Sequence, residues 1–125
     1  MDGFFESSIF RPTRFSKITG RAAIREAIND ILAQSDKTYL SLKEHPLKNT
    51  DPERHRAECE KFCRSVAQIA IRADRVVRAL ESGESNAQHE IARLDFTLAK
   101  AWGSYRASVS LLDTEHFRKR ADCVL

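Results

Sequence analysis

Residues 51–83 read DPERHRAECEKFCRSVAQIAIRADRVVRALESG and contain the signals for both ends of one long helix. Asp51 has the short carboxylate that caps a helix N-terminus, and Pro52 suits the first helical position, where no backbone hydrogen bond is lost. Gly83 is the residue type that most often follows a helix, because it adopts the left-handed backbone conformation freely. The segment between these signals predicts an uninterrupted helix.

The apolar residues of this helix recur at alternating steps of four and three, which is the spacing of a helix packed in a bundle. We predict a buried seam made of Cys59, Cys63, Val66, Ala70, Ala73, Val77 and Leu80. Phe62, Ile69 and Val76 repeat every seven residues beside the seam and are expected to flank it. A helix with so wide an apolar stripe needs neighbouring helices to cover it.

The sequence on either side predicts two such neighbours. Thr19 can cap a helix over about 20–44, which ends ahead of Pro46 because the residue before a proline avoids helical geometry. Its apolar residues keep the bundle spacing if two polar residues fill core places, and the series is then Ile24, Ile28, Ile31, Ser35, Thr38 and Leu42.

The third helix is expected to begin after Ser85, the first residue of a Ser-x-x-Gln capping box. Its apolar periodicity continues at least to Leu112, and Asp113 and Thr114 are expected to cap a short final turn. Alternation with period two is absent beyond a few residues, so no strands are predicted.

Short connections between three helices of similar length predict an all-α fold, an antiparallel up-down-up three-helix bundle. Residues 19–125 are expected to form this single domain, and residues 1–18 an N-terminal arm. The arm has no helical periodicity but carries four aromatic side chains that favour burial, namely Phe4, Phe5, Phe10 and Phe15.

The composition is that of one globular domain. The chain has 125 residues, of which 42% are hydrophobic and only four are glycine, which excludes collagen-like, disordered and disulfide-scaffold proteins. Charges interrupt every apolar run well before the roughly 18 residues that a membrane-spanning helix needs. Three cysteines are an odd number in a sequence without a secretory signal, so a cytoplasmic location with free thiols is expected.

Charge is more informative in its distribution than in its total, because 21 Lys and Arg against 18 Asp and Glu give a net charge of only +3. A helical projection of residues 52–82 places five cations within an arc of about 80°, almost opposite the predicted seam and free of acids. They are Arg54, Lys61, Arg64, Arg72 and Arg75. Such a row suits the phosphates of a nucleic-acid backbone.

Three cations of the C-terminal segment are expected to assist this row: Arg118, Lys119 and Arg120. The alternative is that the row is a solvated face, as most charged helical faces are. Glu60 and Asp74 lie just outside the arc, four residues before Arg64 and Arg78, and are expected to neutralise it in part.

The third predicted helix has two apolar faces. Its inward stripe consists of Ala87, Ile91, Leu94, Leu98, Ala101, Tyr105 and Leu112. On the opposite side lies a file of small residues around one aromatic: Ala92, Phe96, Ala99, Gly103 and Ala107. Because the outer face of a monomeric bundle should be polar, we predict self-association through this file. The N-terminal arm is the alternative cover for it.

The sequence contains no established catalytic or metal-binding motif. His55, Cys59 and Cys63 step by four along one helix, but both cysteines occupy predicted core places and no CxxC or HExxH motif accompanies them. Four glycines in the whole chain do not suffice for a phosphate-binding loop. The sequence therefore predicts no enzyme activity, no cofactor and no metal.

Two functions follow from these surfaces. The favoured one is a self-associating helical interaction module whose basic helix docks on an anionic partner, with the backbone of RNA or DNA as that partner and no readout of bases. The alternative is a protein-binding adaptor or chaperone that uses the outer apolar file and the aromatic arm. Neither involves a membrane.

Overall fold

The structure is a computed structural model and describes residues 14–83 and 85–124. Over these residues the chain is all-helical and contains no strand, as predicted. Its three α-helices are α2 (Arg21–Lys43), α3 (Pro52–Ser82) and α4 (Ala87–Val124), and two 3₁₀ turns are η1 (Phe15–Lys17) and η2 (Pro46–Asn49). None of the helices within the described ranges has the length and apolar character needed to cross a membrane.

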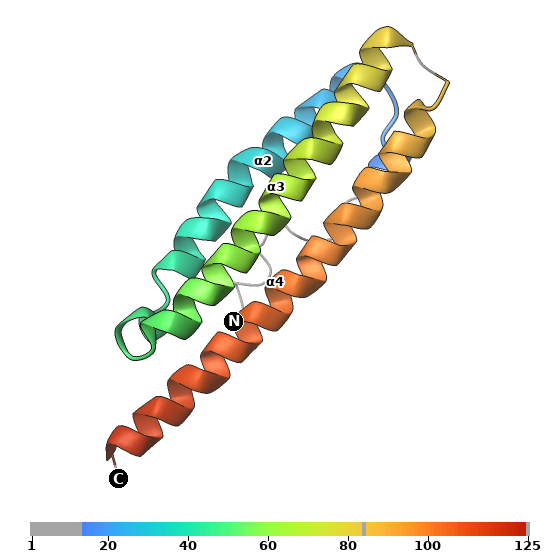
Figure 1. The fold of residues 1–125 in the computed structure, drawn as a ribbon. Helices are drawn as coiled ribbons and strands as arrows, with labels where there is room; N and C mark the ends of the chain where they lie inside the picture. The colour runs from blue at the N-terminus through green and yellow to red at the C-terminus, as the bar shows by residue number, and fades with distance from the viewer. Residues whose placement is uncertain (1–13, 84, 125) are drawn as a thin grey trace.

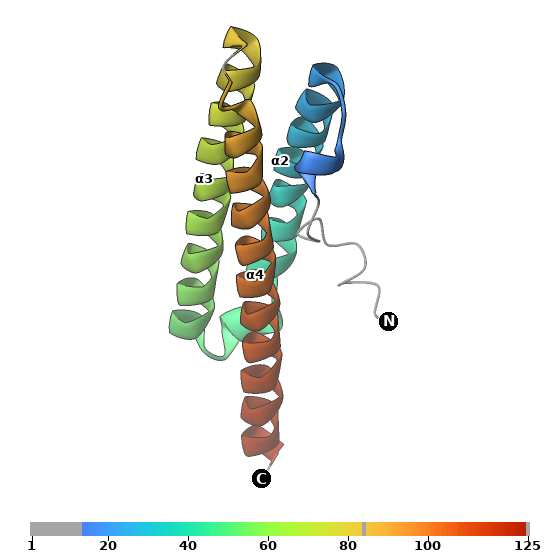
Figure 2. The same ribbon diagram turned by 90° about the vertical axis from the view of Figure 1, so that its right-hand side faces the viewer.

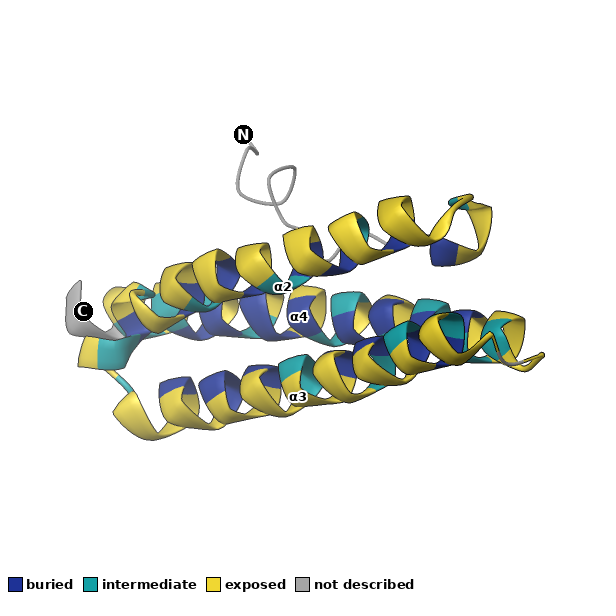
Figure 3. Ribbon diagram, turned by 90° about the horizontal axis from the view of Figure 1, so that it is seen from above, coloured by how far each residue is buried: buried dark blue, intermediate teal, exposed yellow. Residues whose placement is uncertain are grey.

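The three long helices lie side by side, and α4 extends beyond the connection between α2 and α3 (Figure 1). α3 packs against both α2 and α4, while η1 packs against α4. Figure 2 shows η1 beside α2 and α4. The buried residues of all three helices lie on the sides that face their neighbours (Figure 3).

The predicted apolar faces of α2 and α4 are confirmed. On α4, Leu94, Leu98 and Leu112 have no exposed surface, and of the predicted stripe only Ala87 is half-buried. On α2, Ser35 and Thr38 occupy core places and donate hydrogen bonds to backbone carbonyls one turn earlier, at 2.7 and 3.0 Å. These bonds satisfy the hydroxyls locally, so the bundle spacing tolerates two polar residues.

The predicted seam of α3 is confirmed in part, and the buried face is centred farther round the helix. Of the seam, Cys59 and Ala73 are buried, and three residues pack partly buried against the core: Val66, Val77 and Leu80. Ile69 and Val76, which were expected to flank the seam, have no exposed surface, whereas Cys63 and Ala70 are exposed. The reason is side-chain size, because Ile69 and Val76 bury more apolar surface than Cys63 and Ala70. The rotation also brings the cation row from the far side of α3 to the edge of the core.

Both predicted ends of α3 are confirmed. The Asp51 side chain accepts a hydrogen bond from the Arg54 backbone N–H at 3.2 Å, and Gly83 follows the helix with a left-handed φ of 67°. The start of α2 differs by one residue, because Gly20, at a φ of 94°, takes the cap position expected for Thr19. This backbone angle, which glycine adopts without strain, turns the chain into the helix.

α4 does not stop near Leu112 but continues to Val124. The expected caps are used otherwise: the Thr114 hydroxyl donates to the Ser110 carbonyl at 2.9 Å, and Asp113 lies 2.7 Å from His45 Nε2. With both side chains engaged, neither competes with the helical backbone.

Part of the expected N-terminal arm, residues 1–13, lies outside the described residues. In the remainder, Phe15 has no exposed surface and belongs to the hydrophobic core. Asp95 of α4 accepts hydrogen bonds from the backbone N–H groups of Phe15, at 2.5 Å, and Ser16, at 3.1 Å. This contact fixes the start of the described chain to α4, and the next residue of α4, Phe96, remains exposed.

Candidate functional site

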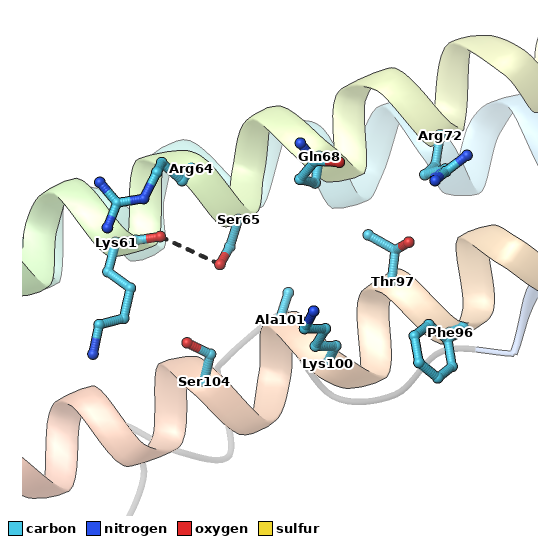
Figure 4. Close-up of a pocket in the computed structure, with 10 residues that line it drawn as sticks. All are labelled: Lys61, Arg64, Ser65, Gln68, Arg72, Phe96, Thr97, Lys100, Ala101 and Ser104. Carbon is cyan, nitrogen blue, oxygen red and sulfur yellow. Dashed lines mark hydrogen bonds between the residues drawn. The ribbon is translucent and has the colours of Figure 1, made fainter.

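A groove of about 380 Å³ lies between α3 and α4 (Figure 4). From α3 it is lined by Lys61, Arg64, Ser65, Gln68 and Arg72, and from α4 by Phe96, Thr97, Lys100, Ala101 and Ser104. Each set follows one edge of its helix, because residues three, four and seven apart lie on the same side.

The groove is strongly cationic. Four of the residues that line it carry a fixed positive charge, and none of those described is acidic. The side chain of Lys61 extends from α3 toward Ser104 on α4 (Figure 4). Cations gathered in a hollow that is free of acids repel one another, and an anion in the groove would relieve this repulsion.

Arg72 is the innermost cation of the groove. The residue is half-buried, and its Nη1 is buried without a hydrogen-bond partner among the described residues. A buried guanidinium N–H that lacks a partner is unfavourable, since charged donors lose more than neutral ones when they leave water. A ligand oxygen that accepted this hydrogen bond would stabilise the site.

A second hollow, of about 360 Å³, adjoins the groove and shares Arg72, Phe96 and Thr97 with it. Its other lining residues are His89, Ala92 and Arg93. Phe96 thus lies where the two hollows meet, and 72% of its surface is exposed. An exposed phenyl ring with cations on both sides can contact a ligand that is both apolar and anionic.

The structure divides the cations predicted from the sequence into two groups. Lys61, Arg64 and Arg72 line the groove, whereas Arg54 and Arg75 are exposed on α3 outside it. The predicted pair of Asp74 with Arg78 is present at 2.8 Å. Among the described residues, no ion pair joins Glu60 to Arg64, so this groove cation is less neutralised than expected.

The C-terminal cations lie away from the groove, toward the start of α3 and the end of α4, and two of them have acidic partners. Arg118 contacts Glu115 at 2.5 Å, and Lys119 lies 3.6 Å from Asp51. Arg120 is exposed. The structure therefore does not bring the predicted tail cations together with the groove.

Two cations of the site were not among the predicted binding residues, namely Lys100 and Arg93 of α4. They are seven residues apart and therefore lie on the same edge of α4. That spacing was a usable signal, but it gains meaning only once this edge is known to face the cation row of α3.

All five residues of the predicted self-association file are exposed, which leaves the outer face of α4 uncovered by the described part of the chain. At Gly103, a methyl group would meet no atom of another element within 4 Å. Glycine inside a helix costs about 1 kcal/mol relative to alanine. No contact among the described residues explains why this position is glycine.

The side chains of His55 and Cys59 on α3 are used in packing. The buried His55 Nε2 lies 2.9 Å from the Leu42 carbonyl and 3.6 Å from Cys59 Sγ. Burial raises the pKa of the Cys59 thiol, and Cys63 raises it further, so the reactive thiolate is disfavoured. In the described ranges, no three His, Cys, Asp or Glu side chains are grouped as metal ligands.

Comparison with known proteins gives no further guide, because no family model, curated protein or solved structure matches this chain.

Proposed function

We propose that this protein is a non-enzymatic helical module that binds the phosphate backbone of a nucleic acid in the groove between α3 and α4. The observation that carries the proposal is the charge of the groove. No described residue of its lining is acidic, and Arg64, Arg72 and Lys100 have no ion pair with a described residue. The fourth cation, Lys61, lies 3.2 Å from the Glu58 carboxylate. A phosphate chain supplies negative charge at regular intervals along such a row of cations.

Arg72 supports a ligand with oxygen acceptors. Its buried Nη1 has a donor to offer, and guanidinium groups form charge-assisted hydrogen bonds with phosphate oxygens. The hydroxyls of Thr97 and Ser104 and the amide of Gln68 add neutral donors along the same groove. All of these groups recognise phosphate and none identifies a base, so binding is expected to be insensitive to sequence.

The test is a fluorescence titration of labelled nucleic acid with nuclease-treated protein at about 50 and 200 mM salt. We expect binding at the lower salt that weakens at least tenfold at the higher, roughly the loss that a few released counterions produce. Absence of binding at the lower salt would refute the proposal. The adaptor alternative would then gain support from a protein partner whose affinity does not change with salt.

The scaffold proposed for this groove is an up-down-up bundle with an N-terminal arm. The support for it is the chain path in Figure 1 and the short connections between consecutive helices. The contacts of Asp95 with the backbone of Phe15 and Ser16 support the attachment of the arm to α4.

The module is also proposed to self-associate along the small residues of the outer face of α4, of which Ala99, Gly103 and Ala107 are spaced four apart. The specific observation in favour is Gly103, because no contact with another described element requires a glycine there, and a glycine on a helix surface lets another helix approach closely.

Replacement of Gly103 by Leu should therefore shift the mass in solution toward that of the monomer while the helical signal is kept. Ala33→Leu, at an exposed position of α2, is the matched control and should leave the mass unchanged. A wild-type protein that is monomeric at every accessible concentration would refute self-association.

A further inference from the structure

We infer that the aromatic ring of Phe96 stacks on an unpaired base, and that the ligand of the groove is therefore a single-stranded nucleic acid. This inference rests on the proposed function, because it takes the groove to be the phosphate site. It goes further by assigning a role to a side chain that the phosphate contacts do not use.

The position of Phe96 carries the argument. The ring is 72% exposed at the junction of the two hollows, with Lys100 and Arg64 lining one and Arg93 the other. A strand that crosses this junction would place phosphates on both sides of the ring and the base between them against it. Proteins that bind single strands combine a basic groove with an aromatic platform in this way.

The length of the cation row favours a strand over a free nucleotide. Lys61 and Arg72 are eleven residues apart on α3, which corresponds to about 16 Å of helix axis. One nucleotide carries its phosphate at a single point and would leave most of this row unmatched. A strand follows the row and satisfies several cations at once.

A duplex fits the ring poorly. The faces of its bases are already covered by their neighbours in the stack, so Phe96 would have to separate two base pairs before it could stack. A single strand presents base faces without that cost, and every base has such a face, so stacking adds affinity without reading sequence. The preference for single strands is thus consistent with the absence of base readout.

The experiment compares two strands of equal charge. Labelled oligothymidylate of about 12 nucleotides and an abasic phosphodiester chain of the same length are titrated with the full chain at low salt. We expect the thymidylate strand to bind about tenfold more tightly, since both strands offer the same phosphates and only one offers bases. A duplex of equal length and thymidine monophosphate complete the set, and both should bind more weakly than the strand.

Variants assign the effect to the ring. Phe96→Ala should abolish the preference for thymidylate while the affinity for the abasic chain is kept, and Phe96→Tyr should restore the preference. Phe117→Ala is the matched control, because Phe117 is 66% exposed on the same helix but does not line the groove. It should retain the full preference.

The outcomes separate the two proposals. If the two strands bind wild-type protein equally, the phosphate site stands and stacking is wrong. If neither strand binds, both proposals fail. Equal or tighter binding of the duplex or of the mononucleotide would overturn the assignment of a single strand. If Phe96→Ala instead lowers the solution mass of the free protein, the ring is covered by a second copy and the inference is also overturned.

Discussion

Two regions of the α3–α4 pair carry cations, namely the groove at the middle of α3 and the region around the C-terminal part of α4, and they differ in whether these cations have acidic partners. In the C-terminal half of α4, Arg118 and Lys119 each have an acidic partner. In the groove farther along, Arg64, Arg72 and Lys100 have no ion pair with any described residue. A cation without an acidic partner can interact with an anionic ligand, so the number of positive residues alone does not identify a binding surface.

Lys61 lies at the boundary between these two regions. Its Nζ is 3.2 Å from the buried carboxylate of Glu58, which also accepts a hydrogen bond from the Ser108 hydroxyl at 2.5 Å. Glu58 thus ends the acid-free surface and holds α3 to α4 at the same time. The contacts of Glu58 are therefore structural, whereas our proposal assigns the groove cations without an acidic partner to a ligand.

The largest effect is expected from reversal of charge inside the groove. Arg64→Glu combined with Arg72→Glu should weaken nucleic-acid binding more than about a hundredfold at low salt, because two contacts are lost and two repulsions are added. The titration described above measures this. Arg54→Glu combined with Arg120→Glu changes the net charge equally at exposed positions outside the groove and should have only a small effect. A control that loses as much as the groove variant would show that general charge is responsible.

A smaller effect is expected when every cation is kept and an acidic partner is added beside them. Ser104→Glu places an acid beside Lys61 and Lys100. The groove cations would then have an acidic neighbour, as Arg118 and Lys119 already do. Binding should fall about tenfold, since the new carboxylate competes with phosphate for the same cations. Ser110→Glu, on the exposed outer face of α4, adds the same charge as a control. If both variants lose the same affinity for nucleic acid, the position of the acid relative to the groove cations does not matter and the proposed role of the groove is wrong.

The smallest effect on binding is expected from the contact between Ser108 and Glu58, which lies outside the groove. Ser108→Ala removes the hydrogen bond to Glu58 and should lower the free energy of unfolding by about 1 to 2 kcal/mol, because a buried carboxylate loses a partner. Urea unfolding measures this loss, and Ser110→Ala provides an exposed control. The affinity for nucleic acid should be unchanged in the folded protein. If affinity falls while stability is unchanged, the contact between Ser108 and Glu58 belongs to the binding surface.

Local signals in the sequence were sufficient for the helix ends. The Asp51 cap and the Gly83 stop are decided by backbone chemistry within a few residues, so each could be predicted without knowledge of the neighbours. The end of α4 could not, because Asp113 and Thr114 are used by contacts with His45 and with the preceding turn.

The rotation of α3 was the main feature that the sequence did not determine. The predicted seam and its flank both repeat every seven residues, so spacing alone does not decide which of them is buried most deeply, and in the structure the fully buried residues are Ile69 and Val76. The groove depends on that rotation, since it turns Arg72 toward α4. The cations of α3 could therefore be predicted, whereas their meeting with Lys100 and Arg93 could not.

Chemical modification of lysines can compare the groove with the C-terminal region of α4 in one sample. Lysines of the folded protein are acetylated with and without oligothymidylate, and the modification of each is measured by mass spectrometry. We predict that Lys100 becomes protected when the strand is bound while Lys119, which is already close to Asp51, is modified equally in both samples. Protection of Lys119 without protection of Lys100 would contradict the account.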